Sequence, residues 1–194
     1  MPKKVIALLA EGFEEVEAVT PIDYLRRAGI EVTVAAVNKG PIVKGSHGIQ
    51  VVPDASLDDL AGEGKFKPSS WDAVVVPGGL PGADNLAASK RVRDFLKGMA
   101  EAGKLVAAIC ASPARVLAPL ELLAGKKFTC YPGEEKNILP SMLTGAGWKE
   151  DRVVVDGNLI TSRGAGTAGE FAAAIIGKLV GQEEAKKLAD KVLL

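Results

Sequence analysis

The stretch Lys104-Leu-Val-Ala-Ala-Ile-Cys110-Ala-Ser-Pro113 decides the fold that the sequence predicts. Its apolar run has the length of one buried strand, and helix-forming residues follow the cysteine directly. The neighbours Ala108, Ala111 and Ser112 are small, as a chain requires where a strand turns sharply into a helix. The G-x-S-x-G elbow of hydrolases holds its nucleophile above the sheet at such a turn. The shape fits here, although the glycines are absent.

The start of a helix makes Cys110 a candidate nucleophile. Free N–H groups and a partial positive charge at that position stabilise a thiolate. They can hold the pKa of a cysteine well below its free value of about 8.5. The alternative is an inert buried cysteine, and the strand–cysteine–helix pattern alone favours neither interpretation over the other.

The same alternation of strand and helix patterns runs along the whole chain. Strands are predicted over residues 4–10, 30–37, 48–53 (a short edge strand), 71–76, the run before Cys110, 127–130, and a hairpin over 152–161 turned at Asp156-Gly157. Helices are predicted over 13–27, 54–61, 84–102, 111–124 (interrupted near Pro119), 171–180 after a capping box at Thr167 and Glu170, and 182–192. This order predicts a single α/β domain over residues 1–194, with a doubly wound, mainly parallel sheet and helices on both faces.

Composition excludes several functional classes. The 194 residues carry 24 Lys and Arg against 24 Asp and Glu, so no basic surface for nucleic acid or membrane binding is indicated. No N-terminal signal and no apolar stretch of about 20 residues is visible, so we expect a cytoplasmic protein without membrane association. Two cysteines, Cys110 and Cys130, predict reduced thiols, and with the single His47 they form no recognisable metal-ligand cluster.

Three predicted strand ends carry unusual residues, namely Glu11-Gly12, Pro77-Gly78-Gly79 and Cys110. Sites in open α/β sheets lie beyond the carboxyl ends of the strands. Because glycine lets backbone N–H groups approach a ligand closely, Gly79 and Ala111 are candidates for an oxyanion hole beside the cysteine. The alternative is a tight turn without a ligand. Neither nucleotide-phosphate glycine pattern is present at this turn.

Acidic residues open the first predicted helix, where they also suit the helix dipole. Helical spacing places Glu17 in the same sector as Phe13 and Tyr24, and places Glu15 on a solvated face. A carboxylate among apolar neighbours has a raised pKa, which suits proton transfer. Helical spacing alone does not decide whether Glu17 or Glu14 is the residue that transfers the proton.

Two further features are interpreted as structural. His47, in Gly-Ser-His-Gly, is typical of a surface turn, and unless it lies near Cys110 the protein has no Cys–His pair. The segment Arg163-Gly-Ala-Gly-Thr167 precedes a predicted helix. It suits a capping turn better than an anion site.

The combination of these segments strongly resembles the ThiJ/PfpI superfamily, and within it the branch of the Parkinson-disease protein (DJ-one). The resemblance covers essentially the whole chain in order. It rests on Glu11-Gly-Phe-Glu-Glu-Val-Glu17, Pro53-Asp-Ala-Ser-Leu57, Val76-Pro-Gly-Gly79, Ala107-Ala-Ile-Cys-Ala111 and Thr161-Ser-Arg-Gly-Ala-Gly-Thr167.

This resemblance implies a flavodoxin-like homodimer with Cys110 at a strained elbow. It implies that Glu17 shares a proton with the sulfur and that Gly79 and Ala111 supply N–H groups beside it. The implied activity is cofactor-free conversion of a small 2-oxoaldehyde, methylglyoxal or glyoxal, to the hydroxy acid, with deglycase activity and a role in oxidative and carbonyl stress. The implied alternative is a non-enzymatic redox sensor or chaperone, in which Cys110 is oxidised to a sulfinate.

Departures from the family pattern narrow the expected chemistry. Ala111 stands where the protease-like and amidotransferase-like branches have a histidine, so hydrolysis of peptides or glutamine would lack its usual base. Tyr131, in Cys130-Tyr131-Pro132, replaces the histidine of the family's Thr-His-Pro segment. We expect Tyr131 to orient the second carbonyl of the substrate. His47 stands in place of an arginine at the dimer interface, and Ser112 and Ala165 stand where glycine and proline are common.

Overall fold

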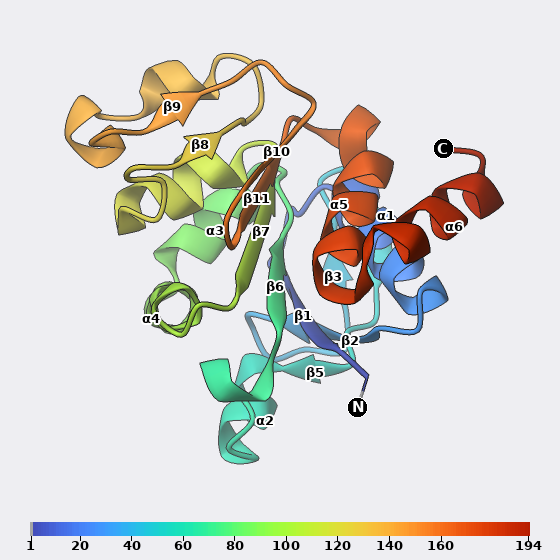
Figure 1. Ribbon diagram of the computed structural model, residues 1–194. Helices are drawn as coiled ribbons and strands as arrows, with labels where there is room; N and C mark the ends of the chain where they lie inside the picture. The colour runs from blue at the N-terminus through green and yellow to red at the C-terminus, as the bar shows by residue number, and fades with distance from the viewer. Residues whose placement is uncertain (1) are drawn as a thin grey trace.

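A seven-stranded sheet runs through the computed structural model, which describes residues 2–194 (Figure 1). The strand order is β10-β11-β7-β6-β1-β2-β5, and every neighbouring pair is parallel except β10 and β11. The strands are β1 (Lys4–Leu9), β2 (Glu31–Ala36), β5 (Ala55–Ser56), β6 (Ala73–Val76), β7 (Leu105–Ile109), β10 (Val153–Asp156) and β11 (Leu159–Ser162).

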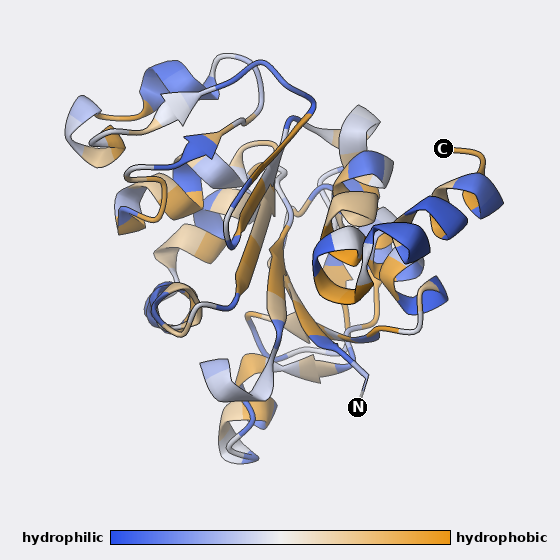
Figure 2. Ribbon diagram, in the orientation of Figure 1, coloured by the Kyte–Doolittle hydropathy of each residue, from blue (hydrophilic) through white to orange (hydrophobic). Residues whose placement is uncertain are grey.

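Helices cover both faces of this sheet, which is why β6 and β7 are apolar along their whole length. One face carries α1 (Glu15–Arg27), α5 (Ala168–Val180) and α6 (Gln182–Val192), and the other carries α2 (Leu57–Gly62), α3 (Gly82–Ala88) and α4 (Lys90–Glu101). The strands are apolar, whereas the outer surfaces of α4 and α6 are polar (Figure 2). The predicted doubly wound α/β domain is therefore confirmed. Within residues 2–194, no helix combines the length and the apolar character needed to cross a lipid bilayer.

The strand order reverses at β1, which lies between β2 and β6. The helix after β1 (α1) packs on one face of the sheet and the helix after β6 (α3) packs on the other, so the chain leaves these two neighbouring strand ends toward opposite faces. Such a reversal leaves a crevice at the carboxyl ends of the strands, where ligands bind in open α/β sheets. The loops after β1, β6 and β7 all open on this crevice.

Two segments that were each predicted as one helix, 84–102 and 111–124, are wrong in this respect, because neither is one continuous α-helix in the structure. The helix predicted over 84–102 is broken at Ser89, because the Ser89 hydroxyl accepts the N–H of Val92 and so begins a new helix, α4. The helix predicted over 111–124 is instead one π-helical turn, Pro113–Leu117 (η2), followed by a 3-10 turn, Ala118–Leu120 (η3). Pro119 has no N–H to donate, so a regular α-helix cannot continue through it.

Two predicted strands lie outside the main sheet. Gln50–Val51 (β4) pairs with Val43–Lys44 (β3) in a separate antiparallel hairpin, and β5 forms the sheet edge instead. Lys127–Phe128 (β8) pairs with Gly147–Trp148 (β9) in a small parallel sheet. Further 3-10 turns are Pro68–Ser70, Glu134–Asn137, Pro140–Leu143 and Ala165–Thr167.

The capping box predicted at Thr167 and Glu170 is also absent. The Thr167 hydroxyl bonds the backbone of Gly164, at 3.1 Å from its N and 2.8 Å from its O. Glu170 forms an ion pair with Arg152 instead, at 2.9 Å. The hairpin of β10 and β11 is confirmed, with Asp156 opposite Leu159.

Candidate functional site

Cys110 follows the last residue of β7 in a left-handed backbone conformation, with φ at +64°. This conformation is costly for a residue with a Cβ and persists only where neighbouring groups fix it. Two backbone hydrogen bonds do so: the Cys110 N–H donates to the Ser162 carbonyl at 2.9 Å, and the Tyr131 N–H donates to the Cys110 carbonyl at 2.8 Å. The structure thus has the elbow that the sequence predicts.

Glu17 lies in the first turn of α1, is only 1% exposed, and is hydrogen-bonded to the Cys110 thiol. Its carboxylate also accepts the N–H of Gly78, at 3.0 Å, and that of Ala165. Glu14 has a different role, because its carboxylate accepts the Glu17 N–H at 2.7 Å and caps the helix. The structure therefore places Glu17, and not Glu14, beside the cysteine, a distinction that helical spacing could not make.

Burial dominates the titration of this pair. It raises the pKa of Glu17 to about 7, and the charge of Glu14 acts in the same direction. Burial and the neighbouring Glu17 carboxylate also raise the pKa of the Cys110 thiol, against the opposing effect of the Ala111 and Gly79 N–H groups. The position of Cys110 at a helix start suggested a lowered pKa for its thiol, but burial of the thiol, and after it the Glu17 carboxylate, raise this pKa instead.

Because their titrations are coupled, Glu17 and Cys110 behave as one acid that binds a shared proton. When the proton is on the sulfur, Glu17 is a carboxylate beside a thiol. When it moves to Glu17, the like charge that opposes the thiolate disappears. The arrangement can therefore generate a thiolate at the moment of attack.

Backbone N–H groups of Gly79 and Ala111 both donate to the Cys110 sulfur. Gly79 has a φ of +89°, and a Cβ there would lie 2.6 Å from the Gly12 carbonyl oxygen. A Cβ on Gly78 would lie 2.7 Å from the Cys110 Cβ. Both positions therefore require glycine, and the two predicted donors do lie beside the sulfur.

Ser112 holds the glycine loop in place. Its buried hydroxyl donates to the Pro77 carbonyl at 2.5 Å and so ties the turn after β7 to the turn after β6. From the sequence, Ser112 was interpreted as a small neighbour of the cysteine, at a position where glycine is common in the family, and this bond was not predicted. A polar side chain in an otherwise apolar segment was the one signal that could have indicated this bond.

Tyr131 lies at the mouth of the site and is 53% exposed. With Arg152 and Arg163 it lines a hollow of about 450 Å³. A Cβ on Gly164 would lie 3.5 Å from the Tyr131 ring and 3.7 Å from the Glu17 carboxylate, so this hollow adjoins the buried pair. The segment 163–167 is held by its own hydrogen bonds, in agreement with the capping-turn interpretation.

His47 does not contact Cys110; its Nδ1 lies 2.9 Å from the Glu15 carboxylate. Within residues 2–194 no Cys–His pair is therefore formed. The placement of Glu15 on a solvated face was wrong, since Glu15 is 4% exposed. Burial opposes its ionisation, but hydrogen bonds from the side chain and N–H of His47 and from the Ile49 N–H lower its pKa to about 2.

The oxygens and the ring nitrogen of Glu14, Glu15 and His47 lie within 4.8 Å of one another, a grouping that the sequence did not predict. Hydrogen bonds already occupy these atoms. Glu14 caps α1, and both Glu15 oxygens accept from the turn around His47. The group is explained as a structural bridge between α1 and the β3–β4 hairpin.

The model of the DJ-1/PfpI family matches residues 3–178. The chain belongs to this family. It is 43% identical over 195 residues to protein dj-1beta of Drosophila melanogaster, covering 100% of this chain and 98% of the relative. It is 35% identical over 192 residues to the glutathione-independent glyoxalase DJR-1.2 of Caenorhabditis elegans, covering 97% and 95%. Among solved structures, Toxoplasma gondii DJ-1, oxidized, superposes with a TM-score of 0.88 at 40% identity, covering 98% of both chains.

Proposed function

We propose that this DJ-1/PfpI protein is a cofactor-independent glyoxalase that converts methylglyoxal or glyoxal to the corresponding hydroxy acid. The observation that carries the proposal is the buried Glu17–Cys110 pair, with two backbone N–H groups beside the sulfur. A relative that spans nearly the whole chain and is named a glyoxalase supports it. Deglycase activity on glycated groups would use the same addition to a carbonyl carbon.

The first step is addition of sulfur to the aldehyde. Cys110 transfers its proton to Glu17 and its sulfur bonds the aldehyde carbon of the 2-oxoaldehyde. The N–H groups of Gly79 and Ala111 then hold the developing oxyanion, which takes the proton back from Glu17 as a hemithioacetal hydroxyl.

The second step is an internal transfer between the two carbons. Ionised Glu17 removes the proton from the former aldehyde carbon and delivers it to the neighbouring carbon, while the proton of the hemithioacetal hydroxyl passes to the oxygen of the neighbouring carbonyl, which is thereby reduced to a hydroxyl. The first carbon is thereby oxidised to a thioester. Water cleaves the thioester and releases the hydroxy acid and the Cys110 thiol, so no external oxidant or cofactor is consumed.

Methylglyoxal consumption with lactate detection tests the proposal. Cys110→Ser and Glu17→Gln should each abolish turnover, whereas Cys130→Ala, at a buried thiol outside the site, should retain it in protein that is folded by circular dichroism. Full turnover by folded Cys110→Ser protein would disprove the scheme. No turnover by folded wild-type protein would favour the second function below.

A redox-sensor function is the second candidate, and the exposure of the two thiols favours it. Cys110 is partly exposed, whereas Cys130 is 0% exposed. Two equivalents of peroxide would convert the Cys110 thiol first to a sulfenic and then to a sulfinic acid, with release of one water each time. Mass spectrometry after mild peroxide treatment tests this, and oxygen gained at Cys130 but not at Cys110 would exclude it.

We also propose a homodimer that forms through the start of α1 and the β3–β4 hairpin. Glu15 bridges these elements, and apolar side chains remain exposed on both, with Val16 at 47%, Val19 at 45%, Ile49 at 57% and Val52 at 74%. Such a grouping is typical of an interaction surface. Light scattering should give twice the chain mass for wild-type protein and the chain mass for Val52→Asp.

A further inference from the structure

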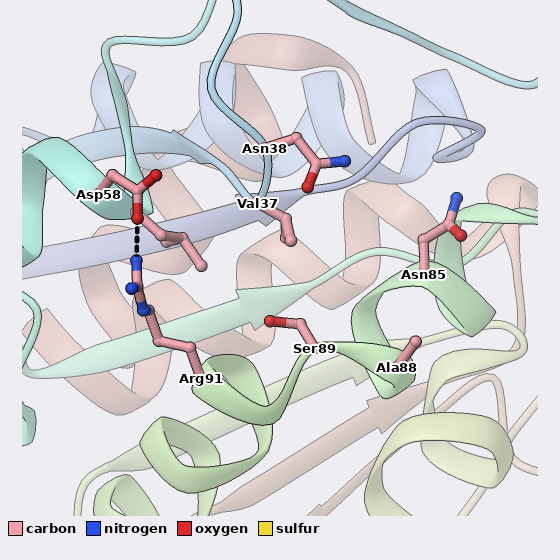
Figure 3. Close-up of a pocket in the computed structure, with 8 residues that line it drawn as sticks. Val37, Asn38, Asp58, Asn85, Ala88, Ser89 and Arg91 are labelled. Carbon is pink, nitrogen blue, oxygen red and sulfur yellow. Dashed lines mark hydrogen bonds and ion pairs between the residues drawn. The ribbon is translucent and has the colours of Figure 1, made fainter.

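A second hollow opens at the carboxyl edge of the sheet, beyond the end of β2 (Figure 3). Its volume is about 540 Å³, within the range of small-molecule sites. It lies between the start of α2 and the break that separates α3 from α4. None of the residues that line it takes part in the glyoxalase scheme, so the inference below is independent of the proposed function.

The hollow carries no net charge. Its charged residues are Asp58 and Arg91, which form an ion pair with each other along one side (Figure 3). A phosphate or carboxylate would have to break this pair to gain a free cation. The lining therefore favours a neutral ligand.

Three side chains have hydrogen-bonding groups left free at this hollow. Asn85 donates its amide N–H to the Glu11 carbonyl at 2.8 Å, which leaves Oδ1 as an acceptor. The Ser89 oxygen accepts the Val92 N–H at 3.3 Å, which leaves its own O–H to donate. Asn38 makes no side-chain hydrogen bond within residues 2–194 and offers both kinds of group.

These free groups surround an apolar floor. Asn38 and Asn85 flank the hollow on two sides, and Ser89 lies between Asn85 and the Asp58–Arg91 pair (Figure 3). Val37, Leu57 and Ala88 form the apolar part of the lining. Within residues 2–194 no aromatic side chain lines the hollow, so a planar base would have no ring on which to stack.

We propose that this hollow binds a neutral sugar through two vicinal hydroxyls. Each hydroxyl both donates and accepts, which matches the free donors and acceptors of Asn38, Asn85 and Ser89, and the sugar's C–H groups match the apolar part of the lining. Asn38 also follows the second strand closely, the region where dinucleotide-binding folds hold the hydroxyls of a ribose. The break at Ser89, which no glycine or proline explains, supplies one of the donors.

Titration of the ¹⁵N-labelled full chain with methyl β-D-ribofuranoside, followed by NMR, tests the proposal. We expect saturable shifts at Val37, Asn38 and Asn85, with a Kd of the order of 1–10 mM because a few neutral hydrogen bonds contribute little net free energy. The 2-deoxy analogue, which lacks one hydroxyl of the pair, should bind at least about fivefold more weakly.

Asn38→Ala is the decisive variant, because the Asn38 side chain is exposed and supports no other residue. It should weaken binding about fivefold or more, whereas the exposed control Asn137→Ala should leave the affinity unchanged. Equal binding of the two ribofuranosides, shifts confined to another surface, or an unchanged affinity in Asn38→Ala would each overturn the proposal.

Discussion

The Glu17 carboxylate on α1 is hydrogen-bonded to the Cys110 thiol at the end of β7, so the helical layer and the sheet meet in one acid–base pair. Glu17 is almost fully buried, and the N–H groups of Gly78 and Ala165 fix its position. The proton that the pair shares therefore determines both the reactivity of the sulfur and part of the protein's stability.

Turnover should depend on the ionisation of Glu17. Its carboxylate must be unprotonated to accept the thiol proton, and its pKa is about 7, so kcat/KM for methylglyoxal should rise as the pH passes through this value. Initial rates between about pH 5 and 9, corrected for the reaction without enzyme, give the profile. A kcat/KM that falls or stays constant across this range would contradict the assigned role.

Stability should show the opposite dependence on pH. The pKa of Glu17 is raised from 4.5 to about 7 on folding, so between these values the folded state binds more protons and the free energy of unfolding decreases as the pH rises. Glu17→Gln cannot ionise and should be more stable than wild type at pH 8, by about 1–3 kcal/mol. Urea unfolding measures this, with the exposed Glu31→Gln as a control; a variant no more stable than wild type would refute the prediction.

Glu15→Gln should destabilise the protein at neutral pH. The pKa of Glu15 is lowered from 4.5 to about 2 on folding, so its contribution is present above pH 4.5 and is lost as the pH falls through 2. Glutamine places an NH₂ group against donors from the turn at His47, and we expect a loss of about 1–3 kcal/mol. Thermal unfolding at pH 7 and pH 3 should show a smaller difference from wild type at the lower pH.

Gly79→Ala should be far more damaging than Gly103→Ala. Both glycines have positive φ, +89° and +67°, so each substitution carries a backbone cost of about 1–2 kcal/mol. A Cβ on Gly103 meets nothing within 4 Å, whereas one on Gly79 would collide with the backbone of the loop after β1. We expect a further loss of about 2 kcal/mol or more in Gly79→Ala, measured by urea unfolding, together with lost turnover. Equal effects of the two substitutions would show that only the backbone conformation matters.

Tyr131→Phe tests whether the phenol orients the substrate. The exposed ring packs beside Gly164, so the variant should fold normally, while loss of one hydrogen bond should lower kcat/KM about 2–10-fold. Tyr131→His, which restores the residue of the family's Thr-His-Pro segment, should retain more activity than Tyr131→Phe. Identical kinetics for all three proteins would remove Tyr131 from the site.

The sequence predicted the parts of the molecule that one strong local signal determines. Apolar runs identified β1, β6 and β7, and the glycines of Pro77-Gly78-Gly79 indicated the N–H groups beside Cys110. The sequence did not distinguish Glu14 from Glu17, which lie in the same turn of a helix. They differ in what their carboxylates contact in the folded protein: that of Glu14 caps α1, whereas that of Glu17 contacts Cys110 and the Gly78 N–H. The break at Ser89 was not predicted from the sequence. A serine begins a new helix only where the hydrogen bond that its hydroxyl accepts from the backbone stabilises the chain more than a continuous helix would.

The loops after β1 and β6 touch through their backbones, with the Gly82 N–H donating to the Gly12 carbonyl at 3.1 Å and the Glu14 N–H donating to the Gly78 carbonyl at 3.0 Å. No side chain separates them, so neither loop can adjust to a change in the other by rotating a rotamer. Loop grafting between members of the family must therefore transplant the two segments as a matched set. A chimera that exchanges only one of them should lose the geometry at Cys110 even where every side chain around the sulfur is retained.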